Sequence, residues 1–266
     1  MEASVKNTTP VPASAAASVA ASAAVSAAEN TDNITIDAGE RYSRVRWLIG
    51  DELSEKVASL RVLLLGLGGV GSYAFEGLVR SGVRNITAVD SDSYEVSNLN
   101  RQLYAVEATL GTPKPEAAVM RAKAVDSTLD GVTGITMMIT PENAADMIEK
   151  AKPDIILDAI DNVSAKIAVA SYAHEHGIKL IMCLGTGNRL DPSKLIVTDL
   201  AKTSGCPLAR VMRRELKARG IGHCEVVTST EEPIKVDGRT PASMVFVPAA
   251  AGMLLASRVV EFAKSR

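Results

Sequence analysis

The chain has 266 residues, of which 47% are hydrophobic, 23% charged and 3% aromatic. This length suits one large α/β domain, or a core of about 220 residues with appendages. The composition excludes wholesale disorder and a disulfide scaffold. With 29 basic and 31 acidic residues the net charge is −2, so any contact with nucleic acid needs a local basic patch. The three cysteines form no CxxC pair, which argues against a zinc ribbon and fits a reducing cytoplasm.

Residues 1–40 differ in composition from the rest of the chain. The stretch from Ala13 to Ala28 consists almost entirely of Ala, Ser and Val. Such small side chains bury too little apolar surface to offset the entropy lost on ordering, so we predict a disordered tail. A secretory signal would need a basic start and bulky apolar residues, and a transit peptide would need arginines before Arg41. We therefore expect the chain to be cytoplasmic, with its main domain over residues 41–266.

Strands and helices alternate from Arg61 onward. Five segments are predicted to be strands: residues 61–66, 85–90, 134–139, 154–160 and 179–185. The first is a continuous apolar run, typical of a strand buried on both faces. Three segments with helical features lie among them: residues 72–82, 141–151 and 163–177, with Thr140 as the N-cap of the second. This alternation predicts right-handed crossovers and a Rossmann-like, doubly wound, mainly parallel sheet.

The chain after Gly185 follows a different pattern. Residues 194–200 and 225–230 look like strands that flank a basic helix. We therefore expect a β-rich and helical extension over residues 186–266, beside a nucleotide-binding core over residues 60–185. Residues 243–257 carry no charge, but this run is shorter than the roughly 20 residues that a spanning helix requires. Pro248 and Gly252 also interrupt it, so we predict a buried core segment and no stable membrane insertion.

A glycine-rich segment follows the first predicted strand directly. Residues Gly66, Gly68, Gly69 and Gly71 lie in GLGGVG, a GxGxxG pattern that opens a predicted helix. Glycines let the backbone approach a phosphate, and a helix N-terminus offers free N–H groups and a partial positive charge. Asp90 ends the second strand, 19 residues after Gly71, where a carboxylate can hold a ribose hydroxyl. These features alone fit NAD and ATP equally well.

Polar residues after the next strands favour ATP. Asn98 and Arg101 lie in SNLNRQ, Lys114 lies in GTPKPEA, and Asp161 follows the fourth predicted strand. Cleavage of the α–β phosphate bond needs cations, because negative charge grows on the leaving pyrophosphate, whereas hydride transfer does not. A carboxylate at the carboxyl edge of the sheet can hold Mg²⁺ beside phosphates. Each residue alone could be a surface cation, a loop lysine or a helix N-cap, but the ordered set predicts ATP chemistry.

This ordered set resembles the ThiF/MoeB/HesA superfamily of ubiquitin-activating-like adenylating enzymes. The resemblance covers residues 41 to about 262 and includes RYSR, GLGGVGS, VDSD, SNLNRQ, GTPK and DAIDN. It implies an ATP site formed by Gly66, Gly68, Gly69, Gly71, Asp90, Asp92, Asn98, Arg101 and Lys114. Family members activate a carboxylate as an acyl-adenylate, usually as homodimers.

The same resemblance implies a role for individual side chains of this chain. Asp90 would bind the ribose, Asn98 and Arg101 would bind phosphates, and Lys114 would stabilise the transition state. Asp161 would hold the magnesium ion. Arg44, in RYSR, would reach the ATP of a neighbouring subunit.

The C-terminal region resembles the tRNA threonylcarbamoyladenosine dehydratase (TcdA) branch of this superfamily. The matching segments are VTDLAKT, PLARVMRRELKARGI, STEEP and SMVFVPAAAGMLLAS. The resemblance implies that ATP adenylates the threonyl carboxylate of a modified adenosine next to the tRNA anticodon. Attack from within the same molecule would then expel AMP and close a ring. It also implies association with a cysteine desulfurase or sulfur-acceptor system.

Residues 208–219 are the candidate tRNA surface. Four apolar residues, Leu208, Val211, Met212 and Leu216, share one helical stripe. Cations cover the rest, with Glu215 as the only acid: Arg210, Arg213, Arg214, Lys217 and Arg219. This density of positive charge suits phosphate neutralisation, although lysine and arginine also line ordinary exposed helices.

The sequence leaves two other functions open. An enzyme that adenylates a small sulfur-carrier protein is disfavoured, because such enzymes often hold a zinc site of paired CxxC motifs. An NAD-binding module, or a nucleotide-binding regulator without chemistry, is disfavoured by Arg101, Lys114 and Asp161.

Free cysteines in proteins mostly behave as small buried hydrophobic residues. A nucleophilic or persulfide role for Cys224 therefore stays a hypothesis.

Overall fold

The computed structural model describes residues 37–237 and 241–266. The predicted tail, residues 1–40, lies outside the described residues except for its last four. There Asp37 caps the short helix α2 (Ala38–Arg41), and its carboxylate accepts a hydrogen bond from Gly39 N at 2.6 Å. Residues 44–266 form a second unit, which holds every described strand.

A seven-stranded sheet runs through this unit in the order β3-β2-β1-β4-β5-β7-β6. The strands are β1 (Arg61–Leu65), β2 (Asn85–Asp90), β3 (Val132–Thr136), β4 (Ile155–Asp158), β5 (Lys179–Cys183), β6 (Leu195–Asp199) and β7 (Glu225–Ser229). All neighbours are parallel except β6 and β7. The chain moves outward in opposite directions from β1 and β4, and open α/β sheets bind ligands beside the carboxyl ends at such a point. The predicted fold class is confirmed.

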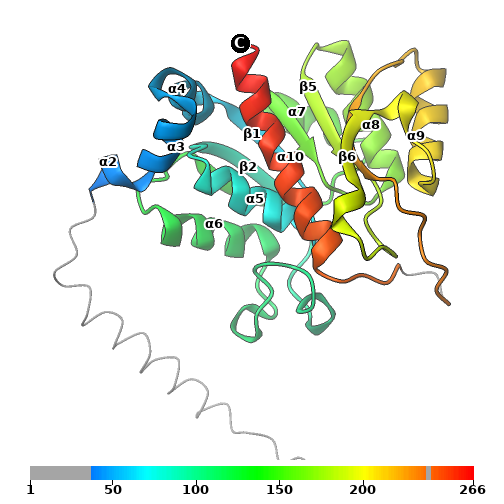
Figure 1. Ribbon diagram of the computed structural model, residues 1–266, viewed down its shortest axis with the longest axis horizontal. Coiled ribbons are helices and arrows are strands. Elements are labelled where there is room, and N and C mark those ends of the chain that lie inside the picture. The colour runs from blue at the N-terminus through cyan, green and yellow to red at the C-terminus, as the bar shows by residue number, and fades with distance from the viewer. Residues whose placement is uncertain (1–36, 238–240) are drawn as a thin grey trace, which may run out of the picture. The chain divides into compact units, whose positions relative to one another are not determined.

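Helices cover both faces of the sheet (Figure 1). One face carries α4 (Asp51–Ser59), α5 (Gly71–Arg80), α6 (Lys114–Val125) and α10 (Phe246–Lys264), and the other carries α7 (Ala144–Ala151), α8 (Val163–Glu175) and α9 (Pro207–Ala218). The shorter helices are α3 (Ser43–Ile49), η1 (Val96–Asn98), η2 (Glu107–Thr109), η3 (Pro192–Lys194) and η4 (Leu200–Lys202). Leu64 of β1 packs into the first core and Leu63 and Leu65 into the second, as expected for a strand buried on both faces.

The third strand begins and ends earlier than predicted. It covers Val132–Thr136 and not residues 134–139. Its length is set by its partner, because β3 pairs in parallel register with β2 from Ile86 to Asp90. The apolar residues that follow continue as a connection in which Met138 is exposed. Hydrophobicity alone therefore placed this edge strand too far along the chain.

The helix after β3 also starts later than predicted. It was expected to begin at Pro141 with Thr140 as its N-cap, and α7 instead begins at Ala144. Asn143 Oδ1 accepts a hydrogen bond from Thr140 N at 2.8 Å, which closes a turn before the helix. Ala144 N also donates to Thr140 O at 3.0 Å, so residues 140–144 form a separate turn, and the regular helix follows it.

The C-terminal helix α10 packs closely across α5, as Figure 1 shows for the red and cyan helices. A Cβ atom on Gly252 would lie 2.3 Å from Val70 O and 2.9 Å from Ala74 N. A Cβ atom on Gly77 would lie 3.0 Å from the Cβ atom of Ala256. Backbone therefore meets backbone where α5 begins, and the last helix of the chain supports the glycine segment that precedes α5.

Among the described residues, α10 is the one helix long and apolar enough to cross a membrane. Its mean hydropathy reaches 1.4, and 44% of the apolar window is buried. Val247, Ala251, Leu255 and Val259 lie in the core. This packing agrees with the predicted buried segment. The predicted interruption at Pro248 and Gly252 was wrong, because α10 runs through both residues, with Pro248 in its first turn.

Gly252→Leu should lower the free energy of unfolding by about 3 kcal/mol, because the new side chain must displace the backbone of α5. Urea unfolding followed by circular dichroism measures this loss. Met253→Leu is the matched control, since Met253 is partly exposed and should tolerate the change. Equal unfolding midpoints for the two variants would show that α10 and α5 do not need this close approach.

Candidate active site

The glycine segment leaves β1 with its backbone pressed against the end of β4. Gly66 has a φ angle of +89°, and a Cβ atom there would lie 2.8 Å from Ala159 O. A Cβ atom on Gly71 would lie 1.8 Å from Gly66 O. Only glycine fits either position. Helix α5 therefore starts directly behind the segment. Ser72 N already donates to Gly68 O at 3.0 Å, which leaves the other N–H groups of the first turn for a ligand at the sheet edge.

Asp90, the last residue of β2, shapes this segment. Its Oδ2 atom accepts a hydrogen bond from Leu67 N at 2.6 Å, and its Oδ1 atom accepts one from Asp92 N at 2.9 Å. Each carboxylate oxygen can accept a further hydrogen bond, so Asp90 retains capacity for a ribose hydroxyl. The residue predicted to bind the ribose thus also fixes the loop that would hold the phosphates.

Lys114 reaches the same point from another direction. It is the first residue of α6 and is only 5% exposed. Its Nζ atom lies 2.8 Å from Asp92 Oδ2 and 3.8 Å from Asp90 Oδ1. The hydrogen bond from Lys114 lowers the pKa of Asp92 below its usual value. The structure therefore holds a buried cation between two carboxylates beside the glycine segment.

The segment SNLNRQ folds around η1 and brings Arg101 to the glycines. The Cγ atom of Arg101 would lie 3.5 Å from a Cβ atom on Gly69, and its Nη1 atom donates to Ser97 O at 2.8 Å. Asn98 is buried, and its Oδ1 atom accepts a hydrogen bond from Glu95 N at 3.2 Å. Arg101 thus lies where a phosphate-binding cation is expected, while the visible contact of Asn98 shapes the turn.

Asp161 lies in the turn after β4, on the other side of the glycine segment. It is exposed, and its side chain has no hydrogen bond or ion pair within residues 37–237 and 241–266. Asn162 is the N-cap of α8, with its Oδ1 atom 3.0 Å from Ala165 N. The N-cap that the sequence allowed at Asp161 therefore falls one residue later, and Asp161 stays available to a ligand.

The donor set at this edge fits magnesium bound together with ATP. No group of three or more His, Cys, Asp or Glu side chains that could hold a metal occurs in the part of the chain that the structure describes. Mg²⁺ is usually held by one or two carboxylates together with substrate phosphates and waters. The free carboxylate of Asp161 suits that arrangement.

Behind the Asp161 turn lies a buried ion pair that the sequence analysis missed. Lys166 of α8 and Asp158 of β4 are both 0% exposed, and Lys166 Nζ lies 3.0 Å from Asp158 Oδ1. Burial raises the pKa of Asp158, and the charge of Lys166 opposes this. A signal was present, because Lys166 shares a helical stripe with Val169 and Ala173, which face the core.

The sequence analysis also missed the hydrogen bonds that hold the segment after residue 240 in place. Asn188 N donates to Ala242 O, and Asn188 Oδ1 accepts from Ala242 N, both at 2.7 Å. Asn100 Nδ2 donates to Ser243 O at 2.9 Å. This segment therefore bridges the loop after β5 and the SNLNRQ segment. A residue such as Asn188, with a φ angle of +60°, is typical of tight turns, but its partner cannot be read from the sequence.

The described contacts do not bring the remaining predicted residues into this cluster. Arg44 is exposed on α3, and its side chain has no partner in the described part of the chain. The five predicted tRNA contacts lie on or just after α9: Arg210, Arg213, Arg214, Lys217 and Arg219. Helix α9 packs on the face of the sheet that also carries α7 and α8.

The cations of α9 differ in how free they are. Arg213 is half-buried, and its Nη1 atom donates to Thr203 O at 2.6 Å and to the hydroxyl of Thr203. Arg214 and Arg219 lie 2.8 Å and 3.0 Å from Glu215 carboxylate oxygens. The other two cations are exposed and have no partner among the described residues. Only part of the predicted surface is therefore open to an anionic ligand.

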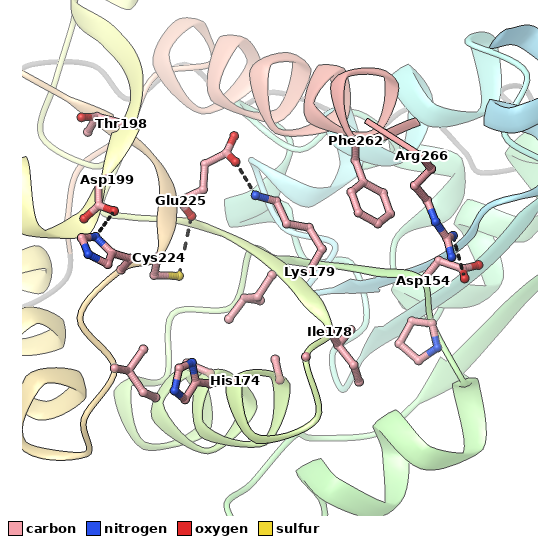
Figure 2. A pocket seen from close by; sticks show the side chains of 17 residues that line it. Asp154, His174, Ile178, Lys179, Thr198, Asp199, Cys224, Glu225, Phe262 and Arg266 are labelled. Atoms are coloured by element: carbon pink, nitrogen blue, oxygen red, sulfur yellow. Dashed lines mark hydrogen bonds and ion pairs between the residues drawn. The ribbon is translucent and has the colours of Figure 1, made fainter. Parts of the chain in front are cut away.

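A cavity of about 940 Å³ lies at the opposite, amino edge of the sheet (Figure 2). Lys179 Nζ lies 2.7 Å from Glu225 Oε2 within it, and Arg266 Nη1 lies 3.0 Å from Asp154 Oδ1. Cys224 also lines the cavity, and burial raises the pKa of its thiol to about 12. A thiol with so high a pKa is a poor nucleophile. The charges in the cavity pair with one another, and we place no catalytic chemistry there.

Asp154 should make acid stability depend on its ion pairs. Burial would raise the pKa of Asp154, but hydrogen bonds from Arg61 and Arg266 outweigh it and lower the pKa to about 2. The unfolded carboxyl has a pKa of about 3.9, so this stabilisation is complete above about pH 4 and disappears as the pH falls toward 2. Asp154→Asn should cost about 2 kcal/mol at pH 7.

Urea unfolding of both proteins between pH 7 and pH 2 measures this difference. We expect the two unfolding free energies to converge in acid. A difference that stays constant over the whole range would contradict the role of the Asp154 charge.

Comparison with known proteins matches nearly all of the described chain to a single protein family. The sequence profile of the ThiF family matches residues 42–264. The tRNA threonylcarbamoyladenosine dehydratase 2 of Saccharomyces cerevisiae is 40% identical over 188 residues, which are 70% of this chain and 42% of that protein. The tRNA threonylcarbamoyladenosine dehydratase of Bacillus subtilis is 34% identical over 239 residues, 83% of this chain and 93% of that protein.

A solved structure gives the same relationship in three dimensions. The crystal structure of the Escherichia coli tRNA N6-threonylcarbamoyladenosine dehydratase in complex with AMP has a TM-score of 0.81 and 30% identity. The match covers 88% of this chain and 98% of that chain. This chain therefore spans less than half of the yeast relative but nearly all of the two bacterial proteins.

Proposed function

Because the chain belongs to the ThiF family, we propose that it is an ATP-dependent tRNA threonylcarbamoyladenosine dehydratase. Likeness over nearly the full length of the two bacterial enzymes supports this proposal. The E. coli enzyme has been solved with AMP and with ATP, which supports ATP as the nucleotide. One observation carries the chemistry: the buried Lys114 lies between two carboxylates beside a glycine segment that has no room for side chains.

The proposed reaction converts a poor electrophile into a good one. An oxygen of the threonyl carboxylate attacks the α-phosphorus of ATP, the bond to the bridging oxygen breaks, and pyrophosphate leaves. A nucleophilic atom of the same threonylcarbamoyl group then loses its proton and attacks the acyl carbon. AMP leaves with one carboxylate oxygen, so the ring closes with the net loss of water. Proximity within one molecule favours this second step.

The side chains at the edge of the sheet supply binding and charge. Asp90 would hold the ribose, and the glycine segment and the start of α5 would hold the phosphates. Arg101 and Lys114 would stabilise the negative charge that grows on the pyrophosphate, and Lys114 can exchange the exposed Asp92 for a phosphate oxygen. Asp161 would hold Mg²⁺, which neutralises phosphate charge when bound.

Lys114→Ala and Asp161→Ala should each lower AMP formation on hypomodified tRNA by more than about 100-fold, because each removes a charge that acts on the phosphates. The assay measures AMP and pyrophosphate released in the presence of ATP and Mg²⁺. Lys123→Ala is the control, since Lys123 lies on the exposed side of α6. Undiminished AMP formation by either active-site variant would overturn the assignment.

The same assay separates the proposed function from its main alternative. Activation of a sulfur-carrier protein would use the same adenylation, with the carrier's C-terminal carboxylate as the substrate. We expect hypomodified tRNA to stimulate AMP release and a small ubiquitin-like sulfur carrier to have no effect. Stimulation by the carrier alone would favour the alternative.

We further propose that tRNA binds along α9 and that two copies of the chain associate in the cytoplasm. The two cations of α9 without partners, Arg210 and Lys217, support the first point. Trp47 and Leu48 are 80% and 84% exposed on α3 next to Arg44, and such apolar surface supports an interface with a second copy. The proposal uses no enzyme thiol, which suits the high pKa of Cys224.

Arg210→Glu combined with Lys217→Glu should weaken tRNA binding and lower the slope of log K against log salt by about 2, because each cation would neutralise one phosphate. ATP binding should not change. Arg213→Met is the contrasting variant, because it removes the hydrogen bond to Thr203 and should mainly lower the free energy of unfolding. Filter binding at several salt concentrations measures the effect. An unchanged slope in the double variant would show that tRNA binds to another part of the protein.

A further inference from the structure

We propose that Lys166 is the positioning residue for Asp161 and for the turn that carries it. The inference rests on the proposed function, because it gives that turn a task in holding ATP and Mg²⁺. Lys166 would not touch the nucleotide. It would act by fixing residues 158–162 from behind and by cancelling the charge of Asp158.

The contacts of Lys166 converge on the carboxyl ends of two strands. Its Nζ atom lies 3.0 Å from Asp158 Oδ1 and 3.4 Å from Asp158 O, and it donates to Cys183 O at 2.9 Å. An ammonium group has three donors, and this geometry uses all of them. Because α8 begins directly after the Asp161 turn, the helix that leaves the turn is bound back to the strand that enters it. The turn is thereby closed at its base.

The turn also touches the glycine segment. Asp158 Oδ1 accepts a hydrogen bond from Ile160 N at 3.1 Å, and Ala159 N donates to Leu65 O at 2.8 Å. Ala159 O occupies the space that a Cβ atom on Gly66 would need. A shift of this turn would therefore move Asp161 and loosen the contact that shapes the phosphate loop.

Charge gives Lys166 a second effect on the site. Asp158 and Asp161 are carboxylates of one turn, and ATP brings several negative charges to the same edge. The ion pair with Lys166 cancels the charge of Asp158 and leaves Asp161 as the free carboxylate. A buried ion pair adds little net stability over apolar side chains of similar volume. Stability alone therefore does not account for the buried pair, whereas positioning does.

The test uses Asp158→Asn combined with Lys166→Met, which removes both charges and nearly preserves volume. Calorimetric titration measures the dissociation constant of ATP with and without Mg²⁺, and urea unfolding of the same samples measures stability. We expect the gain in ATP affinity caused by Mg²⁺ to fall about tenfold or more, as for residues that orient metal ligands, with a much smaller change in Mg²⁺-free affinity. If the double variant does not fold, Lys166→Gln, which keeps an amide donor, takes its place.

Asp154→Asn provides the matched control at the other end of β4. This substitution also removes a carboxylate that forms ion pairs, here with Arg61 and Arg266, but Asp154 lies at the amino edge of the sheet. We expect this variant to keep the wild-type increase in ATP affinity caused by Mg²⁺. The inference would be overturned if the double variant showed the wild-type increase, or if both variants lost the same part of it. Wild-type protein that does not bind ATP would instead overturn the proposed function.

Discussion

Gly66 brings the end of β1 into contact with Ala159 at the end of β4, and a single Cβ atom at that position would meet the carbonyl oxygen of Ala159. The two strands are neighbours in the sheet, so their carboxyl ends already lie together. The absence of a side chain lets the loop after β1 lie flat against the turn after β4. Asp90 then fixes the loop from the β2 side, through Leu67 N. The features of the candidate site follow from this arrangement, because each of its segments is placed relative to that loop.

The sequence contained enough information for the fold class and for this edge of the sheet. The motifs containing Gly66, Asp90 and Asp161 each end or follow a predicted strand, and parallel strands bring their carboxyl ends to one edge. The start of β3 was wrong by two residues, because its pairing with β2 sets its extent and hydrophobicity does not. The ion pair of Lys166 was missed because this helical residue binds Asp158 and Cys183, which end the strands β4 and β5. The contact between Arg213 and Thr203 was missed for the same reason, since the connection before α9 folds back onto the helix.

Strand β4 places two carboxylates in different environments at its two ends. Asp154, just before the strand, faces partly exposed arginines at the amino edge. Asp158, its last residue, is fully buried with Lys166. Water screens the first set, which contributes stability near neutral pH and loses that contribution in acid. The second set lies in a low-dielectric interior, where charge has long reach and geometry is rigid. One short strand therefore separates a stabilising contact from one with a proposed task in the active site.

The packing of α10 on α5 joins two segments that lie far apart in the sequence. Helix α5 and its glycine segment leave the ribosome well before α10 is made. Until Gly252 reaches the backbone around Val70, the start of α5 lacks its covering layer. Domains generally fold as units during and after synthesis. A nascent chain that still lacks α10, or a chain cut short before Phe246, would therefore have a glycine segment without this support. The proposed nucleotide site would be complete only once α10 has packed on α5.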